Sequence, residues 1–61
     1  MPQNLKVGGL ATFRRMFTDA HPQIGEVVFI GLESVIVKTG IPGITDEINL
    51  FVPTNQICQV L

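Results

Sequence analysis

Cys58 is the only cysteine of this chain, and His21 is its only histidine. An internal disulfide needs two cysteines, and a structural zinc ion takes about four Cys or His ligands, so neither can cross-link the fold. A chain of 61 residues buries only about 60% of the surface that its unfolded form exposes, and small domains commonly depend on such a cross-link. This chain therefore has to fold on a hydrophobic core alone.

The composition provides more apolar residues than a core of this size can hold. Hydrophobic residues make up 46% of the chain and charged residues 15%, with a mean hydropathy of +0.42. A small domain has a large surface for its volume, and four basic and five acidic side chains cover that surface poorly. We expect part of the apolar surface to lie against another protein chain, such as a second copy.

The charge balance disfavours a nucleic-acid-binding protein. The net charge is −1 and the isoelectric point is about 5.5, whereas phosphate contacts need clustered lysines and arginines. The sequence shows neither a signal-peptide pattern nor an apolar stretch of the ~20 residues that a transmembrane helix needs. We therefore expect a cytoplasmic protein without a membrane partner.

Turn-forming residues divide the chain into short apolar runs, which predicts an all-β domain. The clearest pair is a hairpin in which Ile24–Ile30 and Ser34–Thr39 are strands and Gly31–Glu33 is the turn. Val27 and Ile30 can face the same side of the sheet only if a β-bulge lies between them. The sequence therefore predicts a bent strand at this point.

Two more strands are predicted in the C-terminal part. Glu47–Val52 has the alternation of a strand, with Ile48 on its inward side. Pro53 cannot donate to a ladder hydrogen bond, so we expect the strand to stop there. Pro53–Gln56 then fits a single 3₁₀ turn, and Ile57–Leu61 a short closing strand.

Residues 10–20 fit two patterns. Leu10, Phe13 and Phe17 have the i, i+3, i+7 spacing of an amphipathic helix. The Gly8-Gly9 pair before them offers no side-chain cap to a helix, and the pattern of the whole chain favours a strand. We therefore expect five strands. The alternative is a helix over residues 10–20 beside a four-stranded antiparallel sheet.

With five strands, residues 1–4 are predicted to form a disordered lead and residues 5–61 a single domain. The side chains that alternation assigns to its core are Val27, Ile30, Val35, Val37, Leu50, Val52, Ile57 and Val60.

Five segments follow a pattern found in known small barrels. They are Lys6–Phe13 (KVGGLATF), Ile24–Ile30 (IGEVVFI), Val35–Val37 (VIV), Leu50–Pro53 (LFVP) and Ile57–Val60 (ICQV). Together they resemble the SH3-like barrels and the related Sm-like barrels. This resemblance implies a small five-stranded SH3-like barrel with a short 3₁₀ turn before the last strand. It implies no single activity, because many functions share the plan.

Five apolar residues have no place in the predicted core. Val28, Ile36 and Phe51 would lie on the outer face, and Ile41 and Ile44 lie in an apolar loop. Exposed apolar patches on soluble proteins are commonly interfaces. We therefore predict that these residues form an interface, through which a non-enzymatic interaction module self-associates as a homo-oligomer or docks on a larger protein assembly.

The alternative function is nucleic-acid binding, as in Sm-like or elongation-factor-type barrels. Arg14 and Arg15 are the only adjacent basic residues, and Lys6 and Phe13 could join them. Basic side chains interleaved with aromatic rings are typical of surfaces that stack bases.

The sequence contains few residues that could carry out catalysis. Cys58 and His21 could form a nucleophile pair, but Cys58 is expected to be buried and inert in an apolar strand, and His21 to be a solvated turn residue. The carboxylates Asp46 and Glu47 are expected to be a solvated strand end rather than a metal site. The sequence therefore predicts no enzyme, no metal and no cofactor.

Overall fold

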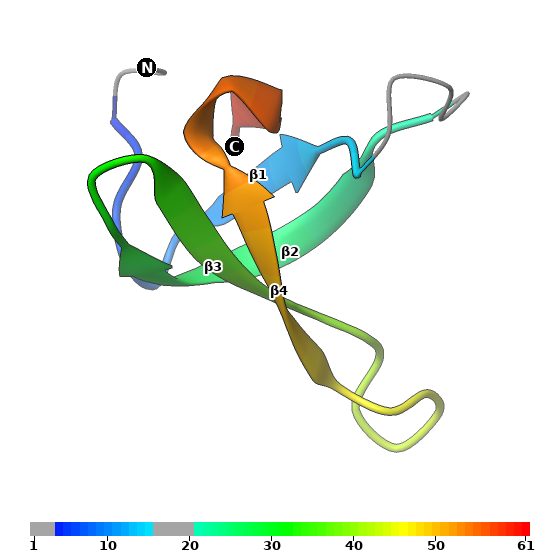
Figure 1. Ribbon diagram of the computed structural model, residues 1–61. Coiled ribbons are helices and arrows are strands. Elements are labelled where there is room, and N and C mark those ends of the chain that lie inside the picture. The colour runs from blue at the N-terminus through cyan, green and yellow to red at the C-terminus, as the bar shows by residue number, and fades with distance from the viewer. Residues whose placement is uncertain (1–3, 16–20) are drawn as a thin grey trace.

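The computed structural model describes residues 4–15 and 21–61, and all of its regular structure except one turn is β (Figure 1). The elements are β1 Leu10–Phe13, β2 Gln23–Ile30, β3 Ser34–Thr39, β4 Ile48–Pro53, the 3₁₀ helix η1 Thr54–Gln56, and β5 Ile57–Val60. The prediction of five strands with a 3₁₀ turn before the last one is confirmed. The helix alternative is wrong for Leu10–Phe13, which are a strand, and its residues 16–20 lie outside the described residues, as do residues 1–3 of the predicted lead.

The five strands form a single sheet in the order β4-β3-β2-β1-β5, and every neighbouring pair is antiparallel. Within the described part of the chain, β4 and β5 do not pair with each other, so the predicted barrel is not closed. The reason is the path of the chain, because η1 leads from β4 across to β1, where β5 finds its partner. The sheet therefore has two edge strands, β4 and β5.

Two β-bulges change which side chains face outward. The register between β2 and β3 shifts between Val27 and Phe29, which confirms the predicted bulge and makes Val28 the extra residue. A second shift separates the pairs Thr12–Gln59 and Phe13–Ile57, so Cys58 is the extra residue of β5. After each bulge, the side chains face the opposite side of the sheet from the one that simple alternation predicts.

The core lies on the inner face of the sheet. Its buried side chains are Ala11, Phe13, Val27, Val35, Val37, Val52 and Ile57, with Leu5, Ile30 and Leu50 packed against them. Val60, which was predicted to be in the core, is only half-buried. Ile48 was predicted to face inward, but its side chain is 50% exposed, so the prediction that it is buried is wrong. Ile48 pairs with Thr39 at the far end of the β3–β4 hairpin, where the core no longer covers the inner face.

Candidate protein-interaction surface

A row of three apolar side chains crosses the outer face of the sheet. The register pairs Phe29 of β2 with Ile36 of β3, and Ile36 with Phe51 of β4. Phe29 is 56% exposed and Phe51 is 77% exposed, while Ile36 between them is half-buried. Directly paired residues on one face lie within about 5.5 Å of each other, so these side chains form one continuous strip. We call this strip the outer row.

The outer row differs from the predicted interface at one position. Ile36 and Phe51 lie on the outer face as expected, whereas Val28 is half-buried and Phe29 takes the exposed place beside Ile36. The cause is the bulge, because Val28 is the unpaired residue and the pairing resumes at Phe29. The sequence predicts a bulge between Val27 and Ile30, but alternation alone does not predict which residue is unpaired.

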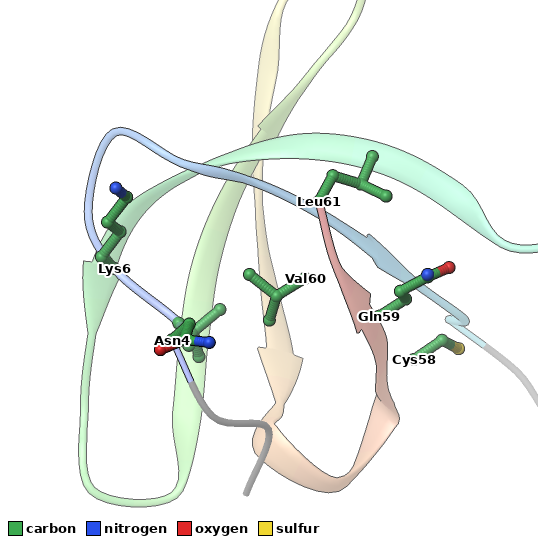
Figure 2. A pocket seen from close by; sticks show the side chains of 7 residues that line it. Asn4, Lys6, Cys58, Gln59, Val60 and Leu61 are labelled. Carbon is green, nitrogen blue, oxygen red and sulfur yellow. The ribbon is translucent and has the colours of Figure 1, made fainter.

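A groove opens between the segment Asn4–Lys6 and strand β5, with a volume of about 590 Å³. Leu5, Val60 and Leu61 supply apolar surface, and the remaining lining residues are Asn4, Lys6, Cys58 and Gln59. Figure 2 shows the Val60 side chain between the two segments. Sequence reasoning missed this groove, because its two walls come from opposite ends of the chain.

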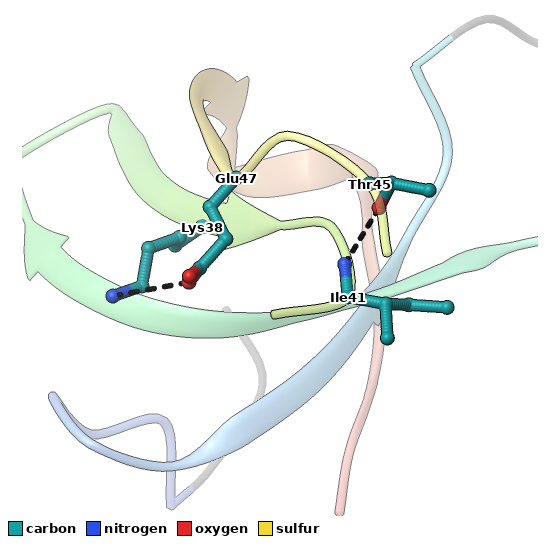
Figure 3. Close-up of polar contacts among 4 residues, drawn as sticks. All are labelled: Lys38, Ile41, Thr45 and Glu47. Atoms are coloured by element: carbon teal, nitrogen blue, oxygen red, sulfur yellow. Dashed lines mark hydrogen bonds and ion pairs between the residues drawn. The ribbon is translucent and has the colours of Figure 1, made fainter. Parts of the chain in front are cut away.

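The β3–β4 loop is held by hydrogen bonds rather than by contact with the core (Figure 3). The amides of Ile44 and Thr45 both donate to the carbonyl oxygen of Ile41 at 2.9 Å, and the Ile41 amide donates to Thr45 Oγ1 at 2.7 Å. At the base of the loop, Lys38 Nζ lies 3.6 Å from a carboxylate oxygen of Glu47. The loop is therefore an ordered turn that stands away from the core.

Ile41 and Ile44 are 54% and 78% exposed at the end of this loop. The pairs Lys38–Asn49 and Thr39–Ile48 lie between them and the outer row. The five residues predicted as one interface therefore divide into two separate surfaces. We call Ile41 and Ile44 the tip.

The residues of the nucleic-acid alternative are not brought together. Phe13 is fully buried in the core, so its ring cannot stack on a base, and its predicted role is wrong. Lys6 lies before the start of β1, where its carbonyl accepts the Gly9 amide, whereas Arg14 and Arg15 follow the end of β1. Strand β1 therefore lies between Lys6 and the two arginines along the chain.

Cys58 is exposed, which corrects the expectation of a buried thiol, and its Sγ lies 3.7 Å from the carbonyl oxygen of Gln56. The β5 bulge is the reason, because the extra residue is not held on the inner face. His21 and Asp46 are exposed, as is Glu47.

Across residues 4–15 and 21–61 we find no cluster of His, Cys, Asp or Glu that could bind a metal ion. The same residues contain no helix with the length and apolarity to cross a membrane.

Comparison of the chain with known protein families, with curated proteins and with solved structures found no match.

Proposed function

We propose that this protein is a non-enzymatic interaction module, which self-associates or docks on a larger protein assembly through the outer row. The observation that carries the proposal is the exposure of Phe29 and Phe51 on either side of Ile36, across three adjacent strands. Aromatic side chains are enriched at protein interfaces and dominate their energetics, because they bury a large rigid surface.

The position of the outer row on the sheet supports the same proposal. The residues of the outer row are paired across three neighbouring strands, so a partner would meet a surface that is already formed. A preformed surface loses little conformational entropy when it binds.

We also infer that the sheet is of the SH3-like type. The order β4-β3-β2-β1-β5 and the 3₁₀ helix between the last two strands support this assignment. Folds of this type carry many functions, so the interaction surface rather than the fold carries the proposal.

Replacing Phe51 with serine tests the proposal. We expect Phe51→Ser to weaken self-association about 30-fold, which corresponds to the ~2 kcal/mol of an aromatic interface residue. Sedimentation equilibrium over a concentration series measures the effect, and urea unfolding shows that the variant still folds. The matched control is Ile24→Ser, because Ile24 is 56% exposed on β2 but pairs with Thr12, outside the outer row.

A tagged chain tests docking on another assembly in the same variants. We expect partners captured by the wild type and by Ile24→Ser to be lost with Phe51→Ser. A protein that stays monomeric at ~1 mM and captures nothing in a Phe51-dependent way contradicts the proposal.

A further inference from the structure

The tip is an exposed apolar projection on a hydrogen-bonded turn. Gly40 and Gly43 adopt φ values of +121° and +80° on either side of Ile41, and the hydrogen bonds to the Ile41 carbonyl fix the turn. Because the turn is held by its own backbone, the two isoleucines can enter an apolar recess without first being ordered.

The groove beside β5 has the size and the lining that the tip requires. Its volume of about 590 Å³ lies within the ~300–1,000 Å³ of cavities that hold a drug-sized molecule, which is larger than two isoleucine side chains. Leu5, Val60 and Leu61 provide apolar contact area, and two amide side chains lie among them.

The charged side chain beside the tip and the charged side chain of the groove have opposite signs. Lys6 carries the only charged side chain among the described residues that line the groove, and Asp46 is exposed two residues after Ile44. Glu47 is already paired with Lys38, whereas neither Lys6 nor Asp46 has an ion-pair partner within the described ranges. Opposite charges at the rim of an apolar contact fix its register and orientation.

The tip and the groove lie at opposite ends of the molecule. In Figure 1 the β3–β4 loop projects from one end, and the segment after the N-terminus and strand β5 lie towards the other. The tip of one chain therefore cannot fill the groove of the same chain.

We propose that the tip of one copy inserts into the groove of a second copy, with Asp46 of the first beside Lys6 of the second. Such a head-to-tail contact uses two different surfaces, so it extends into a ring or an open filament. The proposal rests on the self-association part of the proposed function, but it involves none of the residues of the outer row.

Charge reversal tests the contact. We expect Lys6→Asp and Asp46→Lys each to weaken self-association about tenfold, because each places like charges together, and the two changes in one chain to restore it. Sedimentation equilibrium at low salt measures the three association constants. Weakening without restoration in the double variant overturns the proposal, as does a wild type that stays monomeric at ~1 mM.

Mixing two defective variants gives a sharper result. Ile44→Ser damages only the tip, and Lys6→Asp damages only the groove. An equimolar mixture keeps one intact tip and one intact groove in each pair, so we expect a 1:1 dimer that does not grow with concentration. Absence of this dimer overturns the proposal.

The same measurements separate this contact from the outer row. If Phe51→Ser dissociates the assembly while the charge reversals leave it intact, the tip–groove contact is overturned and the proposed function stands. If the charge reversals act as expected and Phe51→Ser has no effect, self-association depends on the tip and the groove, and the outer row is not its interface.

Discussion

Replacing Phe13 with alanine should leave most molecules unfolded in the absence of denaturant. Phe13 is fully buried in the core, and removing a buried phenylalanine side chain costs about 3–5 kcal/mol. Domains have ~0.05–0.15 kcal/mol of stability per residue, so this cost is comparable to the whole free energy of unfolding of such a short chain. Loss of the cooperative urea transition by circular dichroism is the expected observation.

The same substitution at Phe51 is the control. Its side chain is 77% exposed, so Phe51→Ala should lower the free energy of unfolding by less than ~1 kcal/mol at concentrations where the chain is monomeric. Phe13→Leu keeps most of the buried volume and should give a folded variant with a loss below about 1.5 kcal/mol. Equal urea midpoints for Phe13→Ala and Phe51→Ala would contradict the described core.

Replacing Gly40 with alanine should disrupt the β3–β4 hairpin. A Cβ atom at this position would collide with the backbone carbonyl oxygen of Asp46 and lie 2.9 Å from the Cα of Glu47. The φ of +121° adds strain, because side-chain-bearing residues rarely adopt it. Strain and overpacking each cost about 1–3 kcal/mol, so a total of ~2–6 kcal/mol is expected. Urea unfolding measures this loss.

Gly43 provides the matched control within the same loop. Its φ is +80°, but a Cβ atom there would meet no atom within 4 Å. Gly43→Ala should therefore cost only the ~1–2 kcal/mol of a left-handed backbone. Amide exchange separates the two variants further, since the Ile44 and Thr45 amides that donate to Ile41 should lose protection only in Gly40→Ala. Equal losses in both variants would show that the close approach at Gly40 has no energetic effect.

The strands were predictable because their signals are local. Alternation along Ser34–Thr39 places Val35 and Val37 in the core, and Pro53 marks the end of β4. The β1 strand was harder to predict from the sequence, since its residues also fit the spacing of an amphipathic helix. These residues form a strand because they pair with β2 on one side and with β5 on the other, and the sequence of residues 10–13 does not identify either partner.

The candidate site was predictable only in part. Ile36 and Phe51 follow from alternation, whereas Phe29 depends on which residue of β2 the bulge leaves unpaired. The exposure of Cys58 depends in the same way on the β5 bulge. A bulge sets two residues of one strand opposite one residue of its partner, so its position depends on both strands and not on one of them.

The sequence alone determined an all-β chain that depends on its core, because one cysteine and one histidine allow no cross-link and the apolar residues alternate. It also determined that some apolar residues would remain outside that core. The tertiary structure decided where they lie. Pairing between distant strands collected Phe29, Ile36 and Phe51 into one row and set the tip apart from it, and the two ends of the chain met to form the groove. Alternation is a property of neighbouring residues. The register of the strands and the packing of Asn4–Lys6 beside β5 depend instead on contacts between residues far apart in the sequence.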